Sequence, residues 1–378
     1  MAVGLAWVFG AWWGMALLVN LTTVAMGVLP RRRGLAVDAR PPVSIIVPVK
    51  GADPELAENL AALLGQDYPE YEIVFAVAEP DDPAIPLIER LIAEHPSVPA
   101  RLTTDPARPS GNPKLDNLRR AWRWARHELV LLCDVNARFR PDELCRLAGQ
   151  LGPQIGLLAA VPVATEPNGF CGELEVAFVN SGGARWLIAA ARMGQGVGVG
   201  QTMLLRRRDL DRVGGIDAMA VGPCEDAALA AAFRRAGLTV GMSRDPGWRP
   251  IGRRRFRDLW QRHLRWQCCR KYHAFPLFVF EPTVSPLGMA VAGGLWWGTV
   301  AGLPVPALIA GHLALWFAIE AVYVRLQGWH LSWVSPAAWL VREVMIPALW
   351  LRALVARSMV WRGQRIPLPP MAALRRSK

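Results

Sequence analysis

Three short motifs in this chain carry side chains that could perform chemistry. They are CDVN at residues 133–136, CED at 224–226 and QRHLRW at 261–266. An acid at the end of a buried strand can hold a divalent metal ion on a diphosphate, and an acid at the start of a helix can accept a proton. The third motif, which is basic and aromatic, could bind a phosphate or an acceptor molecule beside a membrane.

Asp134 is the hardest of these residues to explain as purely structural. It follows five apolar residues, 129–133, that are typical of a buried strand, and a carboxylate there is costly unless it is paired or bound to metal. Asn136 lies two residues further on and can face the same crevice. Oxygen ligands of this kind suit Mg²⁺ or Mn²⁺. The sequence therefore predicts that Asp134 binds a metal ion, with a simple strand-end cap as the alternative.

Three other polar residues each have a structural and a functional interpretation. Asp226 lies in the first turn of a helix predicted over 223–236, where it either interacts with the helix dipole or acts as a general base towards a hydroxyl group. Asp82 precedes a proline in a turn, and could contact the base or ribose of a nucleotide or could serve the turn alone. Lys114 could pair with a phosphate or could be a solvated loop residue.

The third motif lies in a strongly basic segment. Residues 249–271 contain nine Lys and Arg against one Asp, a net charge of +8. Nucleic acid is one partner for such a segment. An apolar hairpin follows directly, however, so anionic lipid headgroups and a nucleotide diphosphate fit better, and we expect no nucleic-acid partner. Arg265 and Trp266 could also be no more than anchors at the membrane interface.

The order of the predicted elements indicates how these residues are positioned. Residues 41–250 alternate short apolar runs with longer helical patterns, which predicts an α/β fold with a largely parallel sheet. In such sheets, ligands bind beyond the carboxyl ends of the strands, which is where Asp134 is expected.

Apolar segments near both ends predict a membrane protein. Residues 5–29 are uncharged and long enough to cross a bilayer, and Arg31-Arg32-Arg33 follow, which places the preceding N-terminus outside and the following region in the cytoplasm. Residues 284–324, divided at 302–306, predict a two-helix hairpin. Residues 336–361 carry four charges and fit either a spanning helix or one that lies in the interface.

These observations divide the chain into four expected regions. Residues 1–30 form a transmembrane helix and 31–250 a catalytic domain that faces the cytoplasm. Residues 251–283 form a basic interfacial segment, and 284–378 form the C-terminal transmembrane or interfacial helices.

Taken in order, the motifs resemble the ceramide glucosyltransferase family of inverting GT-A glycosyltransferases. The resemblance covers about residues 1–290 and is most specific at 49–54, 66–72, 81–85 and 112–118. The family's pattern of three aspartates followed by (Q/R)xxRW corresponds to Asp82, Asp134, Asp226 and Gln261, Arg265, Trp266.

This resemblance implies a Rossmann-like GT-A domain, a UDP-sugar donor, Mg²⁺ or Mn²⁺ and a lipid acceptor. By the same resemblance Asp82, Lys114 and Asp134 bind the nucleotide sugar, Asp134 binds the metal, and Asp226 acts in catalysis with Gln261, Arg265 and Trp266. Two departures stand out. The motif around the second aspartate of the family pattern reads Asp134-Val135-Asn136, so metal coordination could rest on Asp134 alone, and residues 181–200 contain no His.

The expected reaction is the transfer of a hexose, glucose by the resemblance, to a primary hydroxyl of a ceramide-like lipid with inversion, in the inner membrane of a bacterium. Three alternatives stay open. The acceptor could be a hopanoid or another polyisoprenoid lipid. The protein could be a processive polysaccharide synthase, although three or four hydrophobic segments are few for a channel. It could also be an inactive membrane scaffold, against which the retained acids argue.

Overall fold

The computed structural model describes residues 2–29, 40–107, 110, 112–361, 363–368 and 370. The chain forms two compact units. The helical unit comprises residues 1–30, 165–189 and 253–359, and the sheet unit comprises 31–164, 190–252 and 360–378. The arginines at 31–33 and the basic tail at 375–378, which bear on the predicted topology, lie outside the described residues.

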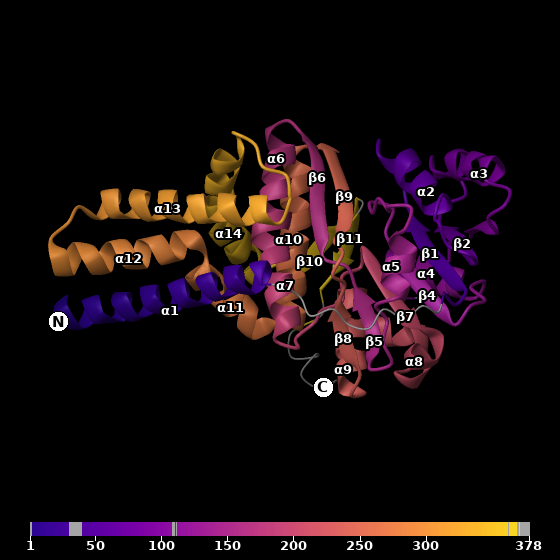
Figure 1. Ribbon diagram of the computed structural model, residues 1–378, viewed down its shortest axis with the longest axis horizontal. Coiled ribbons are helices and arrows are strands. Elements are labelled where there is room, and N and C mark those ends of the chain that lie inside the picture. The colour runs from indigo at the N-terminus through magenta and orange to yellow at the C-terminus, as the bar shows by residue number, and fades with distance from the viewer. Residues whose placement is uncertain are drawn as a thin grey trace. The chain divides into compact units, whose positions relative to one another are not determined.

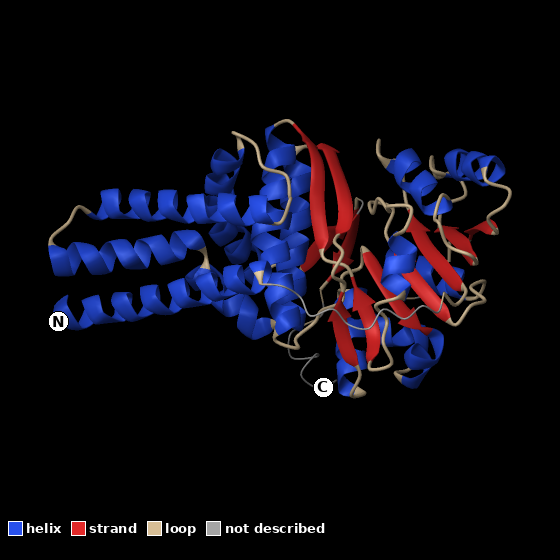
Figure 2. Cartoon of the chain, viewed as in Figure 1, coloured by secondary structure: helices blue, strands red, loops and turns tan. Residues whose placement is uncertain are grey.

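A seven-stranded sheet forms the centre of the sheet unit, in the order β3-β2-β1-β4-β7-β5-β8 (Figure 2). The strands are β1 (Val43–Val49), β2 (Tyr71–Val77), β3 (Ala100–Thr104), β4 (Leu129–Cys133), β5 (Ile155–Ala159), β7 (Thr202–Arg206) and β8 (Thr239–Met242). All neighbouring strands are parallel except β7, which is antiparallel to both β4 and β5. The predicted α/β fold with a mostly parallel sheet is thus confirmed.

Helices cover both faces of this sheet. They are α2 (Leu56–Leu64), α3 (Ile85–Glu94), α4 (Pro113–Trp122), α5 (Glu143–Ala148), α8 (Arg207–Arg212), the 3-10 helix η2 (Gly215–Ala220) and α9 (Glu225–Arg235).

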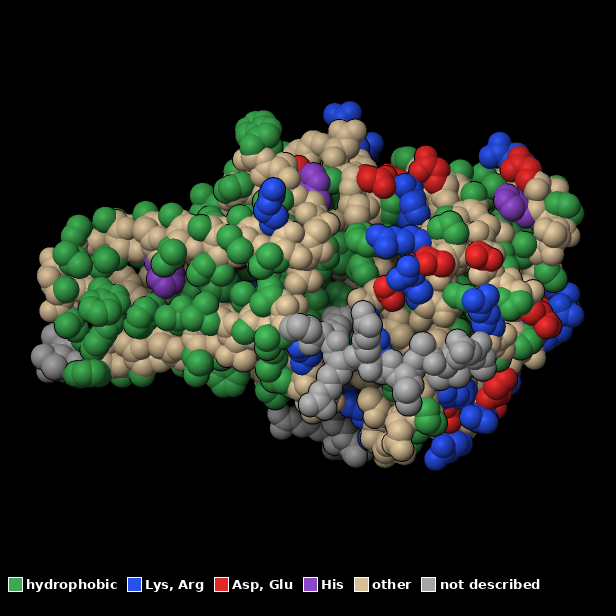
Figure 3. Space-filling view, viewed as in Figure 1, with side chains coloured by type: hydrophobic (Ala, Val, Ile, Leu, Met, Phe, Trp, Pro, Cys, Tyr) green, Lys and Arg blue, Asp and Glu red, His purple; other side chains and the backbone are tan. Residues whose placement is uncertain are grey.

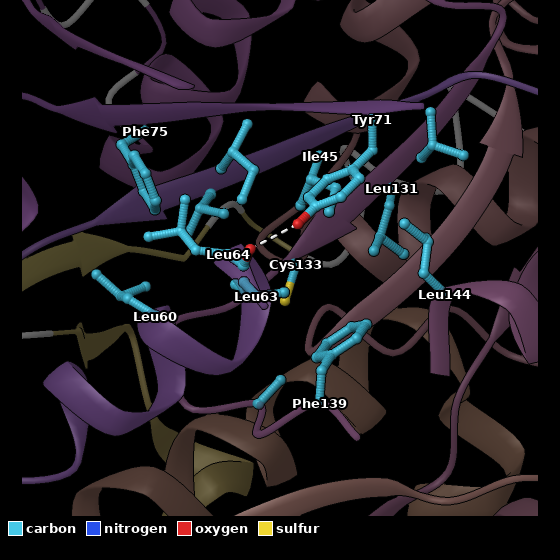
Figure 4. Packing of buried hydrophobic residues seen from close by; sticks show 14 of the residues in the cluster. Ile45, Leu60, Leu63, Leu64, Tyr71, Phe75, Leu131, Cys133, Phe139 and Leu144 are labelled. Carbon is cyan, nitrogen blue, oxygen red and sulfur yellow. Dashed lines mark hydrogen bonds between the residues drawn. The ribbon is translucent and has the colours of Figure 1, made fainter. Parts of the chain in front are cut away.

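Successive residues of β1 are buried on opposite faces of the sheet. On one face, Ile45 packs with Leu60 and Leu63 of α2, as Figure 4 shows. On the other face, Ile46 belongs to a cluster with Leu118 of α4 and Phe233 of α9. A strand covered on both sides in this way reads as a continuous apolar run, which explains the sequence of β1.

The remaining elements are mostly helices. They are α1 (Ala2–Val28), α6 (Phe170–Ala177), the π-helix η1 (Phe178–Ala184), α7 (Arg185–Arg192), α10 (Phe256–His273), α11 (Phe275–Val284), α12 (Pro286–Ala301), α13 (Val305–Leu326) and α14 (Ser335–Val355). Two small sheets pair β6 (Pro162–Asn168) with β9 (Gly247–Arg253), and β10 (Ser358–Trp361) with β11 (Gln364–Pro367).

Within the helical unit, α1, α12 and α13 run side by side (Figure 1). Gly4–Val28 and Val305–Leu326 are each long and apolar enough to cross a membrane, and α11 with α12 forms a third candidate span that is bent by 51°. Hydrophobic side chains predominate over these helices in Figure 3. The predicted hairpin is present as α12 and α13, and the protein is a membrane protein.

Candidate active site

Lys114 lies at the centre of a cluster of acids in the sheet unit. It lies in the first turn of α4, where the side chain of Asn112 caps the helix by accepting from the backbone N–H groups of Lys114 and Leu115. The Lys114 Nζ atom lies 2.7 Å from Asp134 Oδ1 and 2.8 Å from Glu225 Oε1. The lysine therefore bridges the end of β4 and the start of α9. It is not a solvated loop residue, which was the alternative interpretation of the sequence.

The acids keep this lysine charged. Burial alone would lower the pKa of Lys114, but the negative charges of Asp134, Glu225 and Asp226 outweigh that effect and raise it above its ordinary value. The acids outnumber the lysine, so the cluster as a whole is not positive, and a ligand with phosphate groups would be favoured there only together with a bound cation.

Asp226 lies beside this cluster in the first turn of α9. Its Oδ2 accepts a hydrogen bond of 2.9 Å from the Gly200 N–H, and its Oδ1 accepts one of 2.7 Å from the Ala227 N–H. Burial is the main cause that raises the pKa of Asp226 to about 6, and Glu225 adds to the shift while Lys114 opposes it. A carboxylate whose pKa lies near the working pH can act as a general base.

A glycine-rich loop that precedes β7 fits closely against this helix start. A Cβ atom on Gly196 would collide with the Val240 carbonyl, and one on Gly198 with the Asp226 carbonyl. A Cβ atom on Gly200 would lie 2.6 Å from Lys114 Nζ and 3.2 Å from Asp226 Oδ2. The alternating glycines therefore let the backbone approach the two charged side chains that form the site.

Gly200→Ala tests this close approach. The added methyl group must displace the Lys114 ammonium, which two ion pairs hold in place, so we expect turnover to fall by roughly tenfold to a hundredfold through misplacement of the charged groups. Gly152→Ala is the matched control in the same unit, because no atom lies within 4 Å of its added Cβ atom. Equal turnover of the two variants at equal folded fraction would show that the loop does not position the site.

Asp82 is held in a tight turn. Its carboxylate accepts hydrogen bonds of 2.9–3.0 Å from the backbone N–H of Gly51 and one of 2.9 Å from that of Ala84. Gly51 lies two residues after the end of β1 and has a φ of +72°, a conformation that favours glycine. The structural interpretation of Asp82 as a turn residue is thus observed. Its predicted contact with a nucleotide stays a prediction.

The residues at the end of β4 are compatible with a metal ion that a substrate brings with it. Asn136 Oδ1 is buried and has no hydrogen-bond partner among the described residues, and it lies two residues from Asp134. No group of three or more His, Cys, Asp or Glu in the described part of the chain could hold a metal on its own. Magnesium often takes one or two protein oxygens and completes its shell with phosphate and water. Asp134 and Asn136 fit that role.

The third motif lies on α10 in the helical unit. Gln261 and Arg265 are four residues apart and so share a face of the helix. The neighbouring His263 stacks on Phe178 at 4.0 Å and meets the Trp266 ring edge-on at 4.9 Å. Ring packing therefore fixes the orientation of Trp266. The catalytic role of Gln261, Arg265 and Trp266 stays a prediction.

Two acids to which the sequence assigned no role are central to these clusters. Glu225 binds Lys114, although one residue along a helix turns a side chain about 100° away from that of Asp226. Glu175, buried in α6, accepts from Arg262 Nη1 at 2.7 Å and lies 3.1 Å from His263 Nε2. The adjacent acids at 225 and 226 were a usable signal for the first, whereas nothing local in the sequence marks Glu175.

The fold, with acids gathered at the end of β4 and the start of α9, is that of an enzyme, a membrane glycosyltransferase of the GT-A type. The sequence profile of Glycosyl transferase family 21 matches residues 11–372, and the chain belongs to this family. The family resemblance inferred from the sequence is confirmed.

Individual relatives and a solved structure agree with this assignment. Ceramide glucosyltransferase 1 of Caenorhabditis elegans is 26% identical over 346 residues, which cover 89% of this chain and 74% of the relative. The ceramide glucosyltransferase of Pyricularia oryzae is 24% identical, covering 87% of this chain and 85% of the relative. The mannosyltransferase PcManGT from Pyrobaculum calidifontis, solved with GDP-Man and Mn²⁺, shares the fold at a TM-score of 0.59 and 19% identity, over 94% of this chain and 99% of that one.

Proposed function

We propose that the protein transfers a hexose, in the first instance glucose, from a UDP-sugar to a primary hydroxyl of a ceramide-like membrane lipid, with inversion. The observation that carries the proposal is the buried cluster in which Lys114 joins Asp134 and Glu225 beside Asp226. The names of the relatives support ceramide and glucose, and the membrane helices support a lipid acceptor.

Asp226 is the proposed general base. The acceptor hydroxyl gives its proton to the Asp226 carboxylate while its oxygen attacks the anomeric carbon of the donor. The bond between that carbon and the diphosphate breaks, UDP leaves with the electron pair, and an α-linked donor gives a β-glycoside. The Gly200 and Ala227 N–H groups orient the carboxylate for this step.

The other residues bind the donor in this proposal. Lys114 faces the diphosphate, and Asp82 contacts the nucleoside. When bound, Mg²⁺ or Mn²⁺ would be held by Asp134 and Asn136 and would neutralise charge on the diphosphate. Gln261, Arg265 and Trp266 are proposed to bind the donor phosphates or the acceptor.

The raised pKa of Asp226 predicts a pH dependence. Because burial raises this pKa to about 6, the carboxylate is ionised above that pH and protonated below it. We expect kcat/KM to rise with pH, to level off near pH 7 and to fall about tenfold per pH unit well below 6. The profile should be measured with saturating metal, and the residual activity of Asp226→Asn should not show the fall in kcat/KM below pH 6, the acidic limb of the profile. If the variant shows the same fall, a group other than Asp226 is its cause.

The acceptor is tested by direct assay. The purified protein in vesicles, supplied with labelled UDP-glucose and Mg²⁺ or Mn²⁺, should yield a glycolipid by mass spectrometry when ceramide is the acceptor. A product with a hopanoid alone would replace ceramide by the alternative acceptor. A polymer would indicate a processive synthase, and no UDP release with any lipid would favour an inactive scaffold.

We also propose that the protein is a multi-pass protein of a bacterial inner membrane, with residues 31–250 in the cytoplasm, where UDP-sugars are made. The arginines after the first span support this orientation. A membrane-impermeant thiol reagent applied to intact cells should leave cysteines introduced at positions 82, 134 and 226 unmodified. Modification at these positions would show that the protein has the opposite orientation in the membrane.

A further inference from the structure

Helix α14 is long enough to cross a bilayer but is not among the helices that qualify as membrane spans. It carries Arg342 and Glu343 near its middle and Arg352 near its end. We propose that α14 lies in the plane of the membrane surface at which α1 and α13 end, with one apolar face against lipid acyl chains. This inference concerns membrane contact and goes beyond the proposed reaction.

The solvent-accessible face of α14 is mostly apolar, and Arg352 near its end is the one charged residue of this helix that is exposed. Leu340, Val344, Leu351 and Val355 are 47%, 61%, 59% and 67% exposed. Their spacing of four, seven and four residues places them on one side of an α-helix. A face that meets water normally carries polar side chains, so a continuous apolar stripe indicates contact with hydrocarbon.

The opposite face of α14 is fixed to α6 and α10. Met345 and Leu349 pack in a cluster with Leu174 of α6 and Leu259 of α10. At the other end, Lys271, in the last turn of α10, donates hydrogen bonds of 2.9 and 2.8 Å to the carbonyls of Ala353 and Leu354. These contacts reach from the first turn of α10 to its last, so the second half of α14, residues 345–354, stays beside α10.

The charges of α10 determine the level at which both helices lie. Arg262, Arg265 and Arg270 are among its residues, and such charges are costly in the hydrocarbon core. A spanning helix of this length would be about 30 Å long and would carry one of its ends across the bilayer, away from a helix held at the surface. The shared contacts therefore favour an α14 that stays at the same depth as α10.

Contacts with α13 place this level near the end of the candidate spans. Arg342 binds Glu320 through two contacts of 2.6 and 3.1 Å, and Glu320 lies in the last two turns of α13. Gln327, directly after α13, donates a 3.0 Å hydrogen bond to the Gly27 carbonyl of α1, so both helices end at the same level. Figure 1 shows α14 running across the direction of α13. This depth, within about 10 Å of the helix ends, is that of an interfacial helix.

Depth-dependent quenching tests the proposal. An environment-sensitive fluorescent amino acid is introduced genetically, one position at a time, at Leu340, Val344, Leu351 and Val355 of the full chain in lipid vesicles. The vesicles contain nitroxide lipids labelled either close to the headgroup or deep in the acyl chain. We expect the shallow label to quench more strongly at all four positions, with a ratio of shallow to deep quenching that stays the same along the helix.

Leu315 and Leu326 of α13 serve as matched controls on a helix that crosses. Both are exposed in the structure, at 64% and 68%, and their ratios should differ, with Leu315 the deeper. A ratio that changes along α14 as it does along α13 would show that α14 spans the bilayer. Absence of quenching at all four positions, with α13 quenched, would show that the stripe faces water. UDP release by each variant verifies that the chain is folded.

Discussion

Asp226→Asn should lower turnover by roughly a hundredfold or more, the usual scale for loss of a general base. The substitution keeps the size of the side chain and its ability to hydrogen-bond, but it removes the proton acceptor. Donor and metal affinity should change little, because those functions are assigned to Asp82, Lys114 and Asp134. Turnover, UDP affinity and melting temperature are measured together on the purified variant.

Glu225→Gln is the control for this experiment, and the structure changes what it should show. A side chain that faced away from the site would give a mild variant. Since Glu225 instead binds Lys114 at 2.8 Å, we expect weaker donor binding and a turnover about tenfold lower, with the acidic limb of the pH profile retained. If Asp226 were only a helix N-terminal acid, both variants would lose about 0.3–1 kcal/mol of stability and keep near-normal turnover.

Asp134→Ala should abolish turnover and the metal dependence of UDP binding while the protein stays folded. The substitution removes the proposed metal ligand and also one of the two carboxylates that hold Lys114. Calorimetric titration of UDP with and without Mg²⁺ or Mn²⁺ measures the effect. Asp134→Asn, which retains one oxygen ligand, should recover part of the metal dependence. Metal-dependent UDP binding that persists in Asp134→Ala would place the metal elsewhere.

Much of the sheet and one side of the site could be predicted from the sequence. The strand at 129–133 has the predicted bounds, because five apolar residues between polar ones form an unambiguous buried strand. The start of α9 was also visible, since Glu225 and Asp226 near its beginning and Arg234 and Arg235 in its last turn suit the helix dipole.

The rest depended on contacts between distant segments. The small and apolar residues at 197–205 look like one strand, but β7 begins at Thr202, because the glycines before it approach α9 and Val240 instead of pairing in the sheet. The antiparallel direction of β7 follows from the long connection that precedes it, which carries no direction signal. The position of Glu225 depends on a long, flexible side chain that reaches back to Lys114, and helical periodicity alone does not predict such reach.

The discontinuity of the two units bears on how the protein can be made and dissected. Residues 165–189 belong to the helical unit, although they are synthesised between β6 and β7. A ribosome therefore releases β1 to β5 before β7 and β8, which lie beyond this segment, can complete the sheet, and the first span waits for helices beyond residue 253. A fragment of residues 31–250 would contain α6 but not α10 and α14, so the buried residues of α6 would lose the side chains against which they pack. Folded material therefore requires either the whole chain or the fragment 31–250 expressed together with the two ends of the chain.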